Sequence, residues 1–498
     1  MKLKFALPDM RGGFCEEKMP EPVGIVIFGA SGDLTSRKLI PSLFNLFKAG
    51  KLPDKFYILG FARKVFSDAS FREKLLQANE NLTREFLDKC FYVSGDYTDE
   101  FAYEKLSLKI KGLDKAIGTQ GNMIFYLATP YTLFCPIANQ LMRAGLIKQT
   151  GENPWKRVII EKPFGHDLQS AAALDSELKG YLEENQIYRI DHYLGKETVQ
   201  NILMLRFANT IFEALWNNKY IENVRITIAE HLGLEHRAGY FDNAGLLRDI
   251  FQNHGLQLLS MITMETTVSF DADRVRDEKV KLMRSIRPFT EKTLKTDAIR
   301  GQYTAGTIAG QPAAGYREEK DVPADSVTET YFALKMFIDN WRWSGVPFYI
   351  EAGKRLPKKT TEVVITFKQV PYSMFSPMKA SDFYQNKLTI RIQPDEGISL
   401  LIQGKHPGPK LCMTPFSMDF NYNENLGVEI PAAYERLLLD CMLGDQMLFW
   451  RSDGIKAAWQ IVDPVLKYWE EQGGIGLFPY KAGTWGPREA EKFGFGKK

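Results

Sequence analysis

The first half of the chain alternates continuous apolar runs with helical stretches, and this alternation most limits its possible folds. The apolar runs are VGIVIF (23–28), FYILGFAR (56–63), NMIFYLATP (122–130) and KRVIIEKPF (157–164). Helical patterns, such as KLIPSLFNLFKAG at 38–50, lie between them. Strands that are apolar on both faces and joined by helices are typical of a parallel sheet covered on both sides. We therefore expect a doubly wound α/β domain over residues 20–200.

Beyond residue 200 the pattern changes to long strands of half-buried character. The runs are IENVRITIAE (221–230), ETYFALKMFID (329–339), EVVITFKQV (362–370) and KLTIRIQPDEGISLLIQG (387–404). In the last run, Leu388, Ile390 and Ile392 alternate with polar residues, and 394–397 supplies the turn of a hairpin. We expect an α+β domain over 201–498, built on a large, mainly antiparallel sheet and ending in a loop-like tail from Phe478.

The overall composition excludes several classes of protein. A net charge of +3 over 498 residues is too balanced for a nucleic-acid surface. No apolar run approaches the roughly 18 residues of a membrane span, and the N-terminus has no apolar core of signal-peptide length. The cysteines are odd in number, scattered and without a CxxC pair: Cys15, Cys90, Cys135, Cys412 and Cys441. This usage favours the reducing cytoplasm and no zinc site, and we expect no metal site elsewhere.

A glycine-containing turn, GASGDLTSRK at 29–38, follows the first strand directly. A turn of this kind between a strand and a helix is where the pyrophosphate of a dinucleotide binds, because glycine lets the backbone come close and the helix N-terminus favours negative charge. The spacing departs from GxGxxG, since Thr35 occupies the next expected glycine position. A purely structural loop remains the alternative.

The second strand adds a cofactor preference. It ends in GFAR, and Arg63 stands near the position where an NAD-specific domain carries a carboxylate for the ribose hydroxyls. An arginine there accommodates a 2'-phosphate, which indicates NADP rather than NAD. Arg63 is further from Gly29 than the usual spacing of roughly 20 residues, so a solvated arginine at a strand end remains the alternative.

The stretch RIDHYLGKE, residues 189–197, concentrates charge where a loop becomes a helix. The following residues have apolar side chains at helical spacing, so Lys196 falls in the first turn. A cation is disfavoured there by the helix dipole, unless an anion docks at the same end. The alternative is an ordinary surface turn with a capping aspartate and a solvated lysine.

Four segments together resemble the glucose-6-phosphate dehydrogenase family: GASGDL (29–34), EKPFG (161–165), RIDHYLGKE (189–197) and RDIFQNH (248–254). Further segments match in the same order, among them GYFDNAG (239–245), RGQY (300–303), GVPFYIEAGKRL (345–356) and AYERLLLDCMLGDQMLFWR (433–451). The resemblance covers about residues 22–488 and implies a Rossmann-like NADP-binding domain followed by a substrate domain.

The resemblance implies a role for each matched site residue. His192, Tyr193 and Lys196 are implied to hold the phosphate of the sugar. Of the six histidines (His166, His192, His231, His236, His254 and His406), the resemblance assigns the general base to His254 and pairs it with Asp191. From the residues alone, none of the six could be chosen.

The remaining roles concern the sugar and the cofactor. Lys162 is implied to lie between substrate and cofactor, and its bond to Pro163 is expected to be cis. Glu230 and Asp249 are implied acceptors for sugar hydroxyls, and Lys354 and Lys359 are further substrate contacts, with a solvated loop as the alternative for the two lysines. The residues expected to contact the cofactor are Gly29, Ala30, Ser31, Gly32, Asp33, Leu34, Lys38, Arg63 and Lys162.

The resemblance implies oxidation of glucose 6-phosphate to the 1,5-lactone with NADP, by a cytoplasmic homodimer or homotetramer. Two rival functions are considered. A sugar dehydrogenase of the glucose-fructose oxidoreductase type would act on unphosphorylated sugars, and would not need a phosphate grip such as RIDHYLGKE. An NADP sensor without catalysis would need only the nucleotide turn, and would not need Asp191, Lys162 and His254 together.

Overall fold

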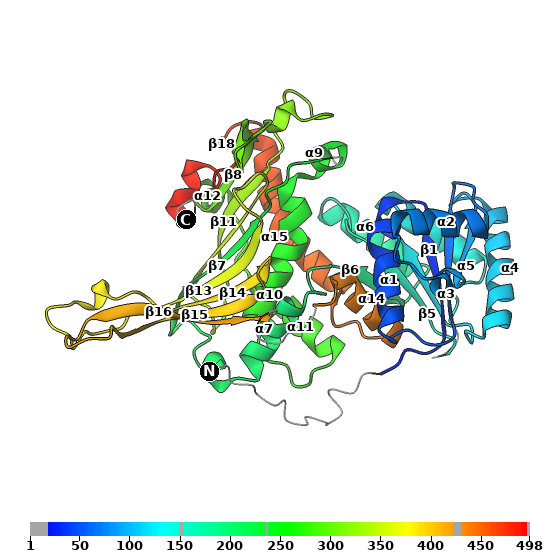
Figure 1. Ribbon diagram of the computed structural model, residues 1–498. Helices are drawn as coiled ribbons and strands as arrows, with labels where there is room; N and C mark the ends of the chain where they lie inside the picture. Colours follow the sequence, from blue (N-terminus) through cyan, green and yellow to red (C-terminus); the bar gives the residue numbers. More distant parts are fainter. Residues whose placement is uncertain are drawn as a thin grey trace. The chain divides into compact units, whose positions relative to one another are not determined.

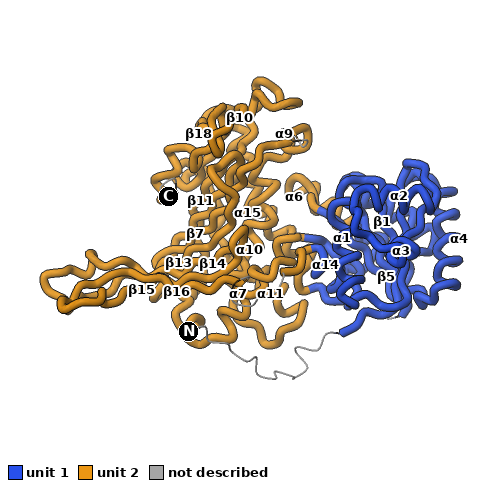
Figure 2. The backbone as a smooth tube through the Cα atoms, in the orientation of Figure 1, with its two compact units in different colours: residues 1–161, 177–190, 434–446 blue, residues 162–176, 191–433, 447–498 orange. Residues whose placement is uncertain are grey.

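A computed structural model describes residues 18–149, 151, 153–235, 238–422, 424 and 430–495. The chain divides into two compact units (Figure 2). Unit 1 consists of residues 1–161, 177–190 and 434–446, and unit 2 of 162–176, 191–433 and 447–498. The N-terminal residues 1–17, with Cys15, lie outside the described residues, as does His236. The expectation of no signal peptide therefore stays a prediction.

Unit 1 contains a sheet of parallel strands, as the apolar runs predicted. Six strands lie in the order β6-β5-β4-β1-β2-β3. Their bounds are β1 Val23–Phe28, β2 Phe56–Ala62, β3 Cys90–Ser94, β4 Met123–Leu127, β5 Lys156–Ile160 and β6 Ile187–Ile190. Every residue of β1, β2 and β4 is buried, because helices cover both faces of the sheet. This is the Rossmann-like order, with its switch point between β1 and β4.

Helices α2, α3 and α4 of unit 1 begin at polar caps, and η1 begins at the glycine turn. The bounds of the helices in this unit are η1 Thr35–Leu39, α1 Ile40–Lys48, α2 Asp68–Ala78, α3 Arg84–Leu87, α4 Glu100–Ile117 and α5 Phe134–Arg143; two further helices, α6 Leu168–Lys179 and α14 Ala433–Leu443, each have residues in both units. The expected helix at 38–50 starts earlier, as the π-helix η1, and continues as α1. Ser67 caps α2 and Asp99 caps α4 through their side chains.

Unit 2 is built on one broad sheet in the order β16-β15-β14-β13-β7-β12-β11-β8-β18 (Figure 1). The bounds are β7 Ile221–Ala229, β8 Ala298–Thr304, β11 Tyr331–Phe337, β12 Pro347–Gly353, β13 Thr360–Phe367, β14 Lys387–Gln393, β15 Gly397–Lys405, β16 Met413–Asn421 and β18 Leu477–Lys481. Only the β7–β12 and β8–β18 pairs are parallel. The expected mainly antiparallel sheet is confirmed, including the β14–β15 hairpin. A separate short hairpin joins β9 Gly306–Ile308 to β10 Gln311–Ala313.

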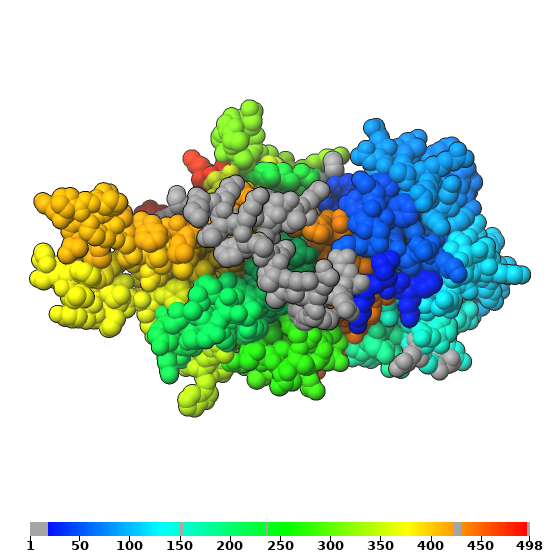
Figure 3. All heavy atoms as spheres, turned by 60° about the horizontal axis from the view of Figure 1, so that its bottom comes forward, coloured from blue at the N-terminus to red at the C-terminus, as the bar shows by residue number. Residues whose placement is uncertain are grey.

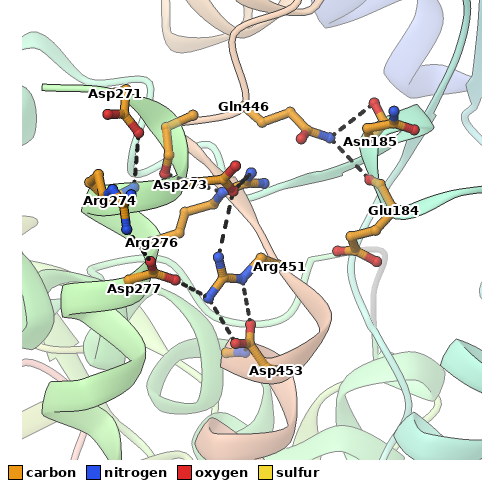
Figure 4. A network of polar contacts seen from close by, with 12 residues as sticks. Glu184, Asn185, Asp271, Asp273, Arg274, Arg276, Asp277, Gln446, Arg451 and Asp453 are labelled. Atoms are coloured by element: carbon orange, nitrogen blue, oxygen red, sulfur yellow. Dashed lines mark hydrogen bonds and ion pairs between the residues drawn. The ribbon is translucent and has the colours of Figure 1, made fainter. Parts of the chain in front are cut away.

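Helices lie along one face of this sheet (Figure 1). Their bounds are α7 Glu197–Phe207, α8 Thr210–Glu213, α9 Ala238–Leu246, η4 Leu247–Gly255, α10 Leu256–Thr263, α11 Ala272–Ser285, α12 Glu291–Asp297 and α15 Ser452–Gln472. An arginine at the start of α15 joins it to α11. The Arg451 guanidinium lies 2.8 Å from Asp453 and 2.6 Å from Asp277 of α11, and Asp273 adds a longer contact (Figure 4).

The expectation of a loop-like tail from Phe478 is wrong. Residues 477–481 form β18, which pairs in parallel with β8 at the edge of the sheet, and the 3-10 helix Arg488–Phe493 follows. Gly483, Gly486 and Pro487 indicated a loop, but they lie after β18. The proline inside the strand, Pro479, is tolerated because one side of an edge strand needs no backbone donor. Its partner lies far away in the sequence, so local composition could not predict the pairing.

The remaining expectations about surface and chemistry can be compared directly. No described helix combines the length and apolar character needed to cross a bilayer. The four described cysteines are all free thiols. The Lys162–Pro163 bond is cis, as expected. In the yellow to orange part of unit 2 (Figure 3), several large apolar side chains are exposed, among them Tyr372, Met374, Leu411 and Met418.

Candidate active site

A π-helix carries two of the expected site residues. In η4 the backbone bonds follow the i→i+5 pattern, so Asp249 and His254, five residues apart, lie on the same side of the helix. Gly245, at φ +71°, breaks the preceding helix, and the Glu329 carboxylate accepts a hydrogen bond of 3.0 Å from the backbone N–H of Leu247. The start of η4 is therefore held by a buried side chain. Asp249 and His254 are themselves buried, at 5% and 1% exposure.

His254 is paired with Asp191. Its Nδ1 lies 2.5 Å from Asp191 Oδ1, and both side chains are buried. Burial alone would raise the pKa of Asp191, but the charge and hydrogen bond of His254 lower it well below the ordinary value. Burial lowers the pKa of His254, although Asp191 opposes this effect. The imidazole is therefore neutral near pH 7, with Nδ1–H donating to the carboxylate and the lone pair of Nε2 pointing away from it.

Lys162 lies on the other side of the same imidazole. Its ammonium is 2.9 Å from His254 Nε2 and donates to the backbone carbonyl of Asp249 at 2.8 Å. The Asp249 carboxylate lies 3.4 Å away. Ligand atoms of Asp191, His192 and His254 come within 4.8 Å of one another, as a metal site would require. The ammonium at Nε2 would repel a cation, so this group suits proton transfer better than it suits a metal ion.

Two aromatic side chains surround the imidazole. Tyr193 stacks on His254, with ring centroids 4.1 Å apart, and its backbone N–H donates to Asp191 at 3.0 Å. His192 meets His254 edge-on at 4.5 Å. Burial lowers the pKa of His192 well below the ordinary value, and the charge of His254 adds to this effect. His192 is therefore a neutral donor or acceptor near pH 7.

The helix that follows begins where the sequence indicated. Lys196 is the N-cap of α7, just before the first turn, and no side chain caps the helix there. Burial and, to a smaller extent, the neighbouring charge of Lys359 lower the pKa of Lys196 to about 8. Two ammonium groups near a helix N-terminus favour an anion, because each stabilises negative charge.

The Lys196 ammonium donates to the side-chain carbonyl of Gln393, at the end of β14. The amide nitrogen of Gln393 donates to the Thr361 hydroxyl at 3.0 Å and to the Tyr193 hydroxyl at 3.4 Å. The two hydroxyls lie 3.4 Å apart. These contacts orient the Gln393 amide so that its oxygen faces the ammonium.

A second pair comes from two neighbouring strands. Glu230 follows β7 and Lys354 follows β12, and these strands are parallel, so both side chains lie at the same edge of the sheet. Glu230 Oε2 lies 2.5 Å from Lys354 Nζ. Unit 2 thus contains all the expected substrate contacts, from Lys162 to Lys359.

The glycine turn lies in unit 1, between β1 and η1. Gly29 has φ +80°, and a Cβ built there would lie 2.2 Å from the carbonyl oxygen of Ala128. The backbone N–H of Gly29 donates to Phe61 O at 3.0 Å, and Gly32 N–H donates to Gly29 O at 2.8 Å. The turn therefore needs glycine at residue 29, whatever its ligand.

The other expected cofactor contacts lie around this turn. Ala30 is buried, Asp33 pairs with Arg37, and Lys38 is exposed on η1. Arg63 follows β2 directly and is exposed, with its guanidinium 5.9 Å from the centre of the Tyr97 ring. Since β1 and β2 are adjacent parallel strands, Arg63 and the turn lie at the same end of the sheet.

Comparison with known families now identifies the chain. Residues 26–201 match the family described as "Glucose-6-phosphate dehydrogenase, NAD binding domain", and residues 203–497 match "Glucose-6-phosphate dehydrogenase, C-terminal domain". The chain belongs to the glucose-6-phosphate dehydrogenase family. The resemblance drawn from its motifs is thereby confirmed.

Individual relatives are similar over almost their whole length. Glucose-6-phosphate 1-dehydrogenase of Aggregatibacter actinomycetemcomitans is 49% identical over 475 residues, with 94% of each chain covered. That of Chlamydia pneumoniae is 45% identical, with 96% of each chain covered. A solved structure of a family member, described as glucose-6-phosphate dehydrogenase in complex with its substrate glucose-6-phosphate, has a TM-score of 0.88 at 36% identity, covering 97% of this chain and 99% of that chain.

Sequence reasoning missed two residues that contact the candidate site and one buried lysine whose pKa responds to the charge of Asp191. Gln393 and Thr361 belong to strand patterns, and their contacts with Tyr193 appear only in the structure. Lys279, on α11, is almost fully buried; burial lowers its pKa to about 7, and the charge of Asp191 opposes this effect. The one signal in the sequence for Lys279 is that a lysine stands among the apolar residues on the buried face of α11.

Proposed function

We propose that this chain is a glucose-6-phosphate 1-dehydrogenase, which oxidises D-glucose 6-phosphate to 6-phospho-D-glucono-1,5-lactone with NADP, the first step of the oxidative pentose phosphate pathway. The observation that carries the proposal is the buried His254 held between the carboxylate of Asp191 and the ammonium of Lys162. A sensor that only binds NADP has no need of such a group.

His254 acts as the general base. Its Nε2 takes the proton of the anomeric hydroxyl while C1 loses a hydride, and a C1=O double bond forms. Asp191 keeps the proton of the imidazole on Nδ1 and stabilises the imidazolium that results. The low pKa of His254 keeps the base neutral before the substrate binds, because burial disfavours its charged form.

Lys162 and two carboxylates position the reacting end of the sugar. The Lys162 ammonium lies at His254 Nε2, so a hydroxyl that binds there meets both groups and its developing negative charge is stabilised by the ammonium. Glu230 and Asp249 accept hydrogen bonds from sugar hydroxyls, and Lys354 orients Glu230.

The other end of the sugar carries the phosphate. Lys196 and Lys359 supply positive charge, the start of α7 supplies free backbone N–H groups, and His192 and Tyr193 supply hydrogen bonds. A neutral sugar would leave the ammonium groups of Lys196 and Lys359 with only the carboxylate of Glu396, among the described residues, to offset their repulsion. The phosphate-binding role therefore favours glucose 6-phosphate over an unphosphorylated sugar.

The cofactor residues of this chain fit NADP. Gly29 lets the turn pack against the backbone of Ala128 at a positive φ, and a glycine turn of this kind brings backbone N–H groups close to a pyrophosphate. Arg63, at the end of β2, supplies the charge that a 2'-phosphate requires. Bound NADP supplies the nicotinamide ring that accepts the hydride. Gly32, Ser31 and Lys38 border the same turn and complete the proposed contacts.

Steady-state kinetics test the proposal directly. We expect kcat/KM to be highest for glucose 6-phosphate with NADP, lower with NAD, and much lower for free glucose. Faster turnover of free glucose at matched concentration would support the glucose-fructose oxidoreductase type instead. Absence of any turnover, with NADP binding retained, would support the sensor.

We also propose a cytoplasmic homodimer or homotetramer. The free thiols suit a reducing compartment, and the exposed apolar side chains between residues 372 and 418 suit contact with a second copy. Light scattering coupled to size exclusion measures the mass of the particle. A mass near the 56.9 kDa of a single chain would exclude both assemblies.

A further inference from the structure

A pair of lysines lies beside the glycine turn of unit 1, on the side of the arginine at the end of β2. Lys74, on α2, donates from its ammonium to the backbone carbonyl of Ser31 at 2.7 Å. Lys64 follows Arg63 in the sequence and comes from the loop after β2. Both ammonium groups approach the same ring, Phe66, at 5.8 Å and 5.2 Å from its centre.

The two ammonium groups have no acidic partner within the described part of the chain. Asp68 on α2, the acidic residue nearest to Lys64 in the sequence, is occupied by Lys109 at 2.8 Å and by the backbone N–H of Tyr92 at 2.7 Å. Like charges held close together cost free energy unless an anion stabilises them. The pKa of Lys74 is accordingly lowered, by partial burial and by the charge of Lys64.

The two lysines lie where this fold binds the adenosine end of a dinucleotide. Adjacent parallel strands β1 and β2 end side by side, so the turn at Ser31 and the residues at 63–64 border the same space. The ribose of a bound dinucleotide lies at the end of the second strand in this fold. A 2'-phosphate on that ribose would therefore meet Arg63 and both lysines.

We propose that Lys74 and Lys64 are specificity-determining residues, which join Arg63 to form a three-cation site for the 2'-phosphate of the cofactor. The proposal rests on the proposed cofactor and adds to it a residue of α2, outside the strand-turn-helix motif. Lys74 also holds the turn through Ser31 O, so its charge is kept close to the ligand instead of moving freely in solvent.

The test measures binding without turnover. Isothermal titration calorimetry compares adenosine 2',5'-bisphosphate with adenosine 5'-monophosphate, which differ only in the 2'-phosphate, on the full-length protein. We expect Lys74→Met to weaken binding of the bisphosphate roughly 5- to 20-fold, less than a fully buried charged contact would give. Binding of the monophosphate should change by less than about twofold, because its phosphate lies at the turn and not at the lysines.

A structural role for Lys74 predicts a different result. If the lysine only fastens the turn to α2, both nucleotides lose affinity equally, and this outcome overturns the proposal. Equal affinity of the unaltered protein for the two nucleotides overturns it as well, together with the choice of NADP over NAD. A protein that discriminates the two nucleotides but turns over no glucose 6-phosphate would instead leave this site supported and the proposed activity refuted.

Three further variants separate charge from folding. Lys64→Met removes a side chain that makes no hydrogen bond to the turn, so it should weaken only the bisphosphate even if Lys74→Met unfolds. Lys74→Arg keeps the charge and should retain most of the discrimination. Lys115→Met, at an exposed position of α4, is the matched control and should leave both affinities unchanged. An equal loss in the control would refute a local site.

Discussion

Replacing Asp191 with asparagine removes one charge from the buried pair and keeps the shape of the side chain. The carboxylate lies 2.5 Å from His254 Nδ1, and each of the two residues is 1% exposed. A hydrogen bond to a charged partner contributes about 1.5–3 kcal/mol. At roughly 1.4 kcal/mol per factor of ten, its loss corresponds to about a 10- to 150-fold lower kcat. We expect at least this loss, because asparagine can also stabilise the wrong tautomer of the imidazole.

The pH dependence of kcat/KM gives a second, independent test of the Asp191–His254 pair. The base is active when neutral, so kcat/KM rises with pH through the pKa of His254. Asp191 raises this pKa against the lowering effect of burial, because the carboxylate stabilises the imidazolium. Without the carboxylate the pKa falls. The acid limb of Asp191→Asn should therefore move to lower pH while the plateau of kcat falls.

The assay is steady-state kinetics between about pH 5 and 9 with saturating NADP, using exposed Asp325→Asn as the matched control. His254→Asn should lower kcat about 100- to 10,000-fold, and the double variant should be no slower than His254→Asn alone, since Asp191 acts through the imidazole. A normal plateau in Asp191→Asn, or an acid limb that moves to higher pH, would refute the reasoning.

Three other predictions address the two ends of the substrate and the cofactor. Lys196→Ala should raise KM for glucose 6-phosphate sharply with NADP affinity unchanged. In the unaltered enzyme this KM should rise above about pH 8, where the partly buried ammonium of Lys196 loses its proton; a KM that does not change with pH would contradict the role. Thr361→Val removes a hydroxyl next to Tyr193 and should raise the same KM about 2- to 12-fold, from a loss of roughly 0.5–1.5 kcal/mol, with little change in kcat. Gly29→Ala places a Cβ against Ala128 O and should abolish NADP binding in a fluorescence titration; unchanged binding would show that the turn can relax.

Several features of the site follow from local sequence because their causes are local. Strands β1, β2 and β4 are buried on both faces, so they need continuous apolar runs that can be read directly. Gly29 marks the turn because its φ is positive. Lys196 stood out because a cation at a helix start conflicts with the dipole, and the structure places a second ammonium, that of Lys359, near it.

Other features depend on contacts that only the tertiary structure makes. No local property distinguishes His254 from the other histidines; its partner Asp191 is 63 residues away in the sequence. The contact of Lys74 with Ser31 spans 43 residues, and that of Tyr193 with Thr361 spans 168. The strand β18 likewise exists because β8 is available to pair with it.

The sequence by itself determined the class of each half, the glycine turn and the charged segment before α7, because burial, backbone angles and the helix dipole act over a few residues. The tertiary structure decided which imidazole has a carboxylate on one side and an ammonium on the other, and which lysines approach the same ring. The physical reason is that the charge state of a buried group depends on neighbours that packing brings together, and these neighbours leave no periodic pattern in the sequence.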